Sequence, residues 1–241
     1  MRYFTSIDRT LYQFGNSTIN TVFTDISRYV NLIDELKDNI VTYTKYHILE
    51  GDRPDTLSIK LYGTPLYYWT FFLMNDHVRL NGWPLTHYDL DAKVKREFPN
   101  TTIVSRNSLT GIMRIGQTVT GSATGTSGKI IHRDANFGHL VVEGAKVFSD
   151  GEAITSPNSS GGTDTCTVAS ASEEYNAIHH YEDASGDWKD ADPAVGNPGS
   201  YVEITNYNRW YKQNEDLKII NIIRPNIIEE VVGAYKKAIS E

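Results

Sequence analysis

An abrupt change of composition in the middle of the chain constrains its fold more than any other feature. The 241 residues include 15 Tyr and 4 Trp, yet neither type occurs between Asp89 and Glu174, a stretch that holds ten of the 18 Gly. Large aromatic rings fill the cores of helix-containing domains, whereas segments rich in Gly, Thr and Val form short strands joined by tight turns. The sequence therefore predicts a small all-β module at residues 105–172, inserted into a host domain of another class.

The overall composition predicts a folded chain that neither spans a membrane nor binds nucleic acid. Charged residues make up 22% and hydrophobic residues 39%, which excludes a disordered chain. The longest apolar stretch, residues 67–74, is far shorter than the ~20 residues of a membrane-spanning helix, and no secretory signal is visible. The net charge of −7 is the wrong sign for a general nucleic-acid binder. The single cysteine, Cys166, fits synthesis in a reducing cytoplasm.

The segment before the module predicts a helix, a strand and a pair of helices. Apolar residues at spacings of three and four favour an amphipathic helix over 22–36, and a run rich in β-branched and aromatic residues favours a strand over 40–49. Pro54 is suited to the first turn of a short helix that ends at Gly63. Thr64 then caps a second helix, with a buried face formed by Trp69, Phe72 and Leu73.

The rest of the host predicts further helices around an acidic loop. Residues 84–98 favour a helix, and the closing strand of the host sheet is expected at 101–104 or further on. Residues 173–199 carry seven acidic residues against one Lys and read as an exposed loop. The apolar run 217–223 then predicts a buried strand, followed by a helix that begins at Pro225.

The residues that suggest chemistry do not combine into a catalytic or metal-binding site. The glycine-rich stretch 121–129 lacks the spacing of a phosphate-binding loop, so we interpret it as a hairpin turn. The adjacent His179 and His180 and the pair His132 and His139 lack metal-ligand spacing and are expected on the surface. Adjacent histidines on a strand are expected on opposite faces. Cys166 has no assignable His partner. The sequence therefore predicts no enzyme, no cofactor and no metal.

One segment does carry a specific pattern. It reads GDRPDTLSIKLYG over residues 51–63, continues TPLYYWTFFLMND over 64–76, and is followed by Gly82 and Trp83. A Gly-Asp turn, a helix that ends in Tyr-Gly and a second helix that ends in Asn resemble the LysM pattern. The fuller string resembles the LysM-like baseplate wedge subunit of T-even-type contractile-tailed phages, the gene product fifty-three family. The last residues, 214–239, are similar to the end of that family.

The resemblance implies an α+β fold: a LysM-like strand-helix-helix host domain with N- and C-terminal helical extensions and the inserted β module. The implied division is 1–45, an assembly segment; 46–104, the LysM-like domain; 105–172, the β module; and 173–241, the acidic loop with a strand-helix unit. The implied function is a structural virion protein that joins neighbouring subunits of a contractile tail baseplate. Its partners would be other wedge proteins within and between wedges, in a large symmetric hetero-oligomer.

Two sets of candidate residues follow from the resemblance. Apolar residues of the terminal segments are the candidate partner interface: Ile26, Ile33, Leu36, Ile220, Ile223 and Ile227. The alternative function is a peptidoglycan- or glycan-binding LysM module, with sugar contacts from two loops over one end of the helix pair: Gly51, Asp52, Arg53, Gly63, Thr64 and Pro65. A third function, a peptidoglycan-cleaving enzyme, would need a carboxylate pair or metal site that nothing in the sequence singles out.

Overall fold

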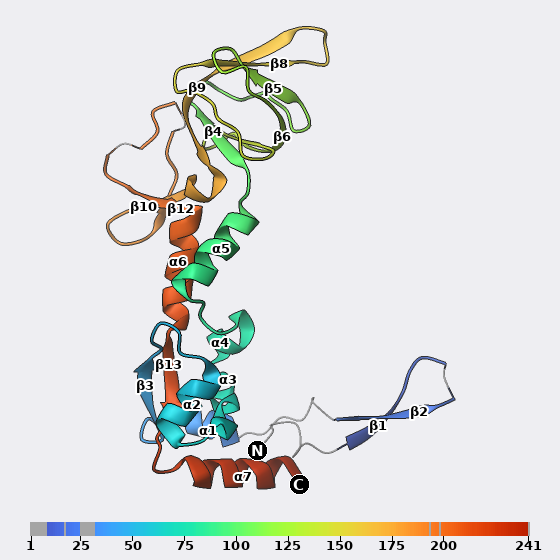
Figure 1. Cartoon of the computed structure of the whole chain (residues 1–241), viewed down its shortest axis with the longest axis vertical. Helices are drawn as coiled ribbons and strands as arrows, with labels where there is room; N and C mark the ends of the chain where they lie inside the picture. The colour runs from blue at the N-terminus through green and yellow to red at the C-terminus, as the bar shows by residue number, and fades with distance from the viewer. Residues whose placement is uncertain (1–8, 17, 25–31, 193, 198, 241) are drawn as a thin grey trace. The chain divides into compact units, whose positions relative to one another are not determined.

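The computed structural model describes residues 9–16, 18–24, 32–192, 194–197 and 199–240 (Figure 1). Helices make up 30% and strands 31%, which confirms the α+β class. The chain divides into two compact units. Unit 1 contains Met1–Thr86 and Asn214–Glu241, and unit 2 contains His87–Gln213, so that unit 2 is inserted between the two segments of unit 1.

Unit 1 is built around a strand, two helical segments and a second strand. Strand β3 (Tyr43–His47) leads into helix α2 (Pro54–Tyr62), then into a 3-10 turn, η2 (Pro65–Tyr67), and helix α3 (Trp69–Met74). The partner of β3 is strand β13 (Ile219–Ile223), which pairs antiparallel with it. The chain therefore completes this two-stranded sheet only after it has passed through unit 2.

The local signals around α2 act as the sequence predicts. Gly63 takes a left-handed conformation with φ 71°, which suits glycine, and its N–H donates to the Ile59 carbonyl. The Thr64 hydroxyl accepts a hydrogen bond from the Leu66 N–H at 3.3 Å. The predicted strand and both predicted helices of this region are confirmed in kind.

Two apolar clusters stabilise unit 1, and α3 contributes to both. One gathers side chains from α1 (Leu32–Asp38), α3, β13 and α7 (Ile228–Ser240): Leu36, Trp69, Met74, Ile223, Ile228, Val231, Val232, Tyr235 and Ile239. The other includes Ile48, Leu57, Phe71, Val78, Ile220 and Ile222. Phe71 of α3 is fully buried in the second cluster. Phe72 and Leu73, which the sequence predicted on the buried face, are only half-buried.

Asparagine side chains join segments of unit 1 that are far apart in sequence. Asn75, which precedes helix α4 (Asp76–Asn81), donates to the carbonyls of Phe71 and Asn221 at 2.8 Å and accepts the Asn221 N–H at 2.7 Å. Asn214 accepts the Leu85 N–H at 2.7 Å and donates to the Leu85 carbonyl at 3.0 Å. The points where the chain leaves and re-enters unit 1 are therefore hydrogen-bonded to each other.

Unit 2 contains a closed barrel of six strands in the order β4-β7-β6-β5-β8-β9. Its strands are β4 (Thr101–Ser105), β5 (Thr118–Gly121), β6 (Ser127–Asp134), β7 (His139–Val142), β8 (Ala153–Pro157) and β9 (Thr163–Glu173). The segment predicted as an all-β module thus forms most of this barrel. Its standing as a separable domain remains a prediction, as does the division at residues 45, 104 and 172.

The remainder of unit 2 is a pair of helices and a small sheet. Helix α5 (His87–Glu97) precedes the barrel, as predicted, and α6 (Asn206–Leu217) crosses the boundary into unit 1. Strands β11 (Trp188–Lys189), β10 (Ile178–Glu182) and β12 (Val202–Thr205) form an antiparallel sheet in that order. The segment 173–199, predicted as an exposed loop, therefore contains two of these strands.

The turn between β5 and β6 is the glycine-rich stretch, and the hairpin interpretation is confirmed. A buried carboxylate, Glu152, holds this turn: it accepts the N–H groups of Ala123 and Thr124 at 3.1 Å and that of Ser149 at 2.7 Å. Burial alone would raise the pKa of Glu152, but these hydrogen bonds outweigh it and lower the pKa below the usual value.

The prediction of a helix over 22–36 is wrong at its start. Val22 lies in strand β2 (Asn20–Thr24), which pairs antiparallel with β1 (Arg9–Gln13). Residues 25–31, which include Ile26, lie outside the described residues, and a helix is observed only from Leu32. The β-branched and aromatic residues of 18–23 suit a strand, and this signal competes with the helical spacing that begins at Val22.

Candidate partner-binding surfaces

The predicted partner-interface residues lie mainly in the cores of unit 1. Leu36, Ile220 and Ile223 are buried in the two clusters, and Ile227 is half-buried against the first. Ile26 and the side chain of Ile33 lie outside what the structure describes. The described members of this set stabilise the chain itself, so a partner surface has to be sought among other residues.

The predicted glycan loops lie at opposite ends of one helix. Gly51, Asp52 and Arg53 precede α2, whereas Gly63, Thr64 and Pro65 follow it. A helix of nine residues is about 13 Å long at 1.5 Å per residue. The loops therefore do not frame one end of the helix pair, because the chain passes along the whole of α2 between them.

The polar groups of these loops have partners within unit 1. The Asp52 carbonyl accepts the Trp83 indole N–H at 2.7 Å, and its carboxylate lies 3.7 Å from the Lys60 ammonium. The Arg53 guanidinium pairs with Asp55 at 3.0 Å. The Thr64 carbonyl accepts the buried Ser58 hydroxyl at 2.7 Å. These contacts shape the turns on either side of α2.

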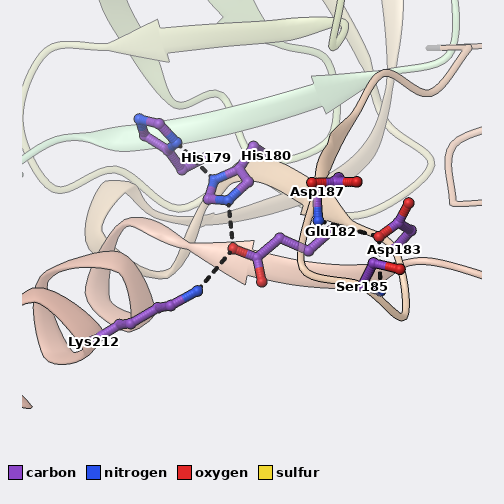
Figure 2. A network of polar contacts seen from close by, with 7 residues as sticks. All are labelled: His179, His180, Glu182, Asp183, Ser185, Asp187 and Lys212. Atoms are coloured by element: carbon purple, nitrogen blue, oxygen red, sulfur yellow. Dashed lines mark hydrogen bonds and ion pairs between the residues drawn. The ribbon is translucent and has the colours of Figure 1, made fainter. Parts of the chain in front are cut away.

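A polar network in unit 2 joins strand β10 to helix α6 (Figure 2). His180 Nε2 lies 3.1 Å from the Glu182 carboxylate, which also pairs with Lys212 at 3.3 Å. His179 Nδ1 lies 3.0 Å from His180 Nδ1. The expectation that the two histidines are surface residues on opposite faces is wrong, because His180 is buried and a β-bulge between Ile178 and His180 interrupts the alternation.

The electrostatics of this network are those of a structural contact. The hydrogen bond from His180 and the ammonium of Lys212 lower the pKa of Glu182. Since an ionised carboxylate only accepts hydrogen bonds, His180 donates to Glu182 from Nε2. Burial lowers the pKa of His179, and the nearby Arg209 charge adds to this effect. The Trp188 ring stacks on His180 with ring centres 4.0 Å apart.

The other candidates for chemistry have local roles in the structure. Cys166 is buried in the barrel, where desolvation raises the pKa of its thiol. Among the described residues, no group of three or more His, Cys, Asp or Glu side chains is placed to hold a metal ion. Within the same part of the chain, no helix combines the length and apolar character needed to cross a membrane.

The surface that sequence analysis missed is the β1–β2 ribbon. Its apolar side chains are largely exposed: Leu11 66%, Tyr12 55%, Phe14 57%, Val22 56% and Phe23 40%. Exposed apolar groups that cluster in this way mark sites of interaction with other molecules. The β-branched and aromatic residues of 18–23 were the available signal, and the helical spacing of 22–36 competes with it.

Comparison with known proteins finds a match to the first part of the chain. A family model described as base plate wedge protein 53 matches residues 2–88. The matched region includes the β1–β2 ribbon, α1, β3 and the helices α2 to α4, and it ends where unit 2 begins. The match does not extend to residues 214–239, whose similarity to the end of that family stays a prediction. No curated protein matches the chain.

Proposed function

From the match of residues 2–88 to the base plate wedge protein 53 family, we propose that this chain joins neighbouring subunits in the baseplate of a contractile phage tail. The coarser role, a structural component of the phage baseplate, follows from the family itself. The family match is the observation that carries the proposal. Other wedge proteins are the proposed partners, in a large symmetric hetero-oligomer assembled from subunits made in the host cytoplasm.

The architecture of unit 1 supports a joining role. A subunit that holds its neighbours against the force of tail contraction needs a rigid body and exposed contact surfaces. The Asn75 and Asn214 hydrogen bonds fix distant segments of the chain to one another, and the β1–β2 ribbon exposes apolar side chains. The strand-helix-helix-strand order of β3, α2, α3 and β13 is also the order of a LysM module, which we propose as the fold of unit 1.

Co-expression with the other wedge proteins of the same phage tests this function. The chain is expected to co-purify with them as a complex of defined stoichiometry, as judged by size-exclusion chromatography with light scattering. Chitin oligosaccharides and peptidoglycan fragments titrated onto the free chain test the glycan alternative. Saturable glycan binding together with failure to co-purify would contradict the structural role, whereas co-purification without glycan binding would support it.

A further inference from the structure

The β1–β2 ribbon has apolar side chains on both of its faces. In the antiparallel register, Leu11 lies opposite Val22 on one face. Thr10 lies opposite Phe23 on the other face. The centre of the Phe14 ring lies 4.9 Å from that of Tyr12 and 5.3 Å from that of Phe23. Each face therefore carries exposed apolar groups. An ordinary surface hairpin instead has one apolar face and one polar face that is exposed to water.

The outer edges of the ribbon are open among the described strands. β1 and β2 form a sheet of two strands, and no third described strand pairs with either. A ribbon of this kind is marginally stable in water, and open edges offer backbone N–H and C=O groups to another sheet. The sequence from residue 9 to residue 24 contains one charged side chain, Arg9. It therefore lacks the charges that usually protect an exposed edge strand.

We propose that the ribbon completes a β-sheet of a neighbouring baseplate subunit. One ribbon edge pairs with an unpaired edge strand of that subunit, and apolar side chains of the same subunit cover both ribbon faces. This is recognition by strand addition, in which main-chain hydrogen bonds supply affinity and alternate side chains fill pockets. The inference rests on the proposed joining function and specifies the chemistry of one joint.

The two apolar faces favour this occupant over a second copy of the chain. Two ribbons related by a two-fold axis would cover one face or one edge of each copy and leave the other apolar face in water. The ribbon is also short, with strands of five residues. Stable two-body interfaces bury about 1,200–2,000 Å², so a ribbon of this size fits a joint that other contacts of the assembly support.

Substitutions on each face test whether the neighbouring subunit covers both faces of the ribbon. Leu11→Asp places a charge on one face and Phe23→Asp places one on the other, while Asn16→Asp adds the same charge in the connecting turn. Each face variant is expected to enter the co-expressed wedge at least about tenfold less than the wild type in direct competition, because a buried charge without a partner weakens an interface. The turn variant should enter like the wild type. Unchanged circular dichroism and thermal midpoints of the free variants would show that unit 1 remains folded.

Hydrogen exchange tests the backbone pairing. Amides of the ribbon strand that pairs, residues 9–12 or residues 20–24, are expected to exchange at least about tenfold more slowly in the wedge than in the free chain, because the outer-edge N–H groups of that strand gain partners. A wedge that contains the wild-type chain with unprotected ribbon amides, or that accepts both face variants, would overturn the inference and leave the joining function intact. A free chain that is dimeric through one ribbon face would favour a second copy as occupant and overturn the inference. A wild-type chain that does not enter the wedge would refute both proposals.

Discussion

Acidification is expected to weaken the barrel of unit 2 through one buried histidine. His139 in strand β7 is 7% exposed, so the expectation that it lies on the surface is wrong, and the Phe137 ring lies beside it with ring centres 5.7 Å apart. Burial lowers the pKa of His139 to about 4 from an ordinary value of 6.5; the Arg106 and His132 charges act in the same direction, and Asp134 opposes them. The folded protein therefore resists protonation of a group that the unfolded chain protonates readily.

The sign and the size of the effect follow from linkage. A group whose pKa is lower in the folded state contributes stability above its unfolded pKa and loses it as the pH falls through the folded pKa. For His139 the loss begins near pH 6.5 and is nearly complete just below pH 4. The difference between the pKa values of His139 in the unfolded and the folded chain corresponds to about 3 kcal/mol of unfolding free energy, at about 1.4 kcal/mol per pKa unit.

Comparison of His139→Phe with the wild type isolates this contribution. Phe keeps a ring against Phe137 but cannot be protonated. Urea unfolding of the full chain at pH 7 and pH 4, followed by hydrogen exchange of barrel peptides, should show the wild type losing about 3 kcal/mol more than the variant. Other titrating groups act alike in both proteins and cancel in the difference. His47→Gln, a change at an exposed position of strand β3 outside the barrel, is the control and should behave like the wild type. Equal pH dependence of the His139→Phe variant and the wild type would refute the reasoning.

Three further predictions concern stability and modularity. Trp69→Ala should destabilise unit 1 by about 3–5 kcal/mol in a denaturant titration, because it empties a large site in the first cluster; a loss below about 1 kcal/mol would show that Trp69 is not a core residue. Glu152→Gln should lower the unfolding free energy of the barrel by about 1–3 kcal/mol, because an amide cannot accept all the N–H groups that the carboxylate accepts; an unchanged melt would contradict this. Replacement of residues 87–213 by a short Gly-Ser linker should leave unit 1 folded, since Leu85 and Asn214 are hydrogen-bonded; an insoluble product or lost helical circular dichroism would contradict it.

The sequence predicted those parts of the fold that depend on local signals. Pro54 and Gly63 mark the two ends of α2 because proline suits a first turn and glycine tolerates a left-handed residue. The break in aromatic content located the barrel because short strands and tight turns need a different composition from helix cores. The sequence did not show that β3 pairs with β13, since strand partners so far apart are chosen by the packing of the whole unit.

The candidate surfaces were harder to predict because burial depends on tertiary structure. The apolar spacing around Leu36 and Ile223 is the same whether a helix or strand faces its own core or a partner, and the structure places both in the core. The positions of His179 and His180 depend on a β-bulge that no local sequence pattern predicts. The β1–β2 ribbon was missed because Val22 fits the helical spacing of 22–36, while the ribbon residues do not alternate as in an ordinary surface strand.

The central claim, that this chain is a structural part of the baseplate, is tested most directly by its position in the virion. Cryo-electron microscopy of purified virions, with the density searched for the β3–α2–α3–β13 unit, is the decisive measurement. This unit is expected to lie in the baseplate in symmetric copies and to touch at least two other subunits. Virions that lack the chain, or that carry it only outside the baseplate, would contradict a structural role in the baseplate.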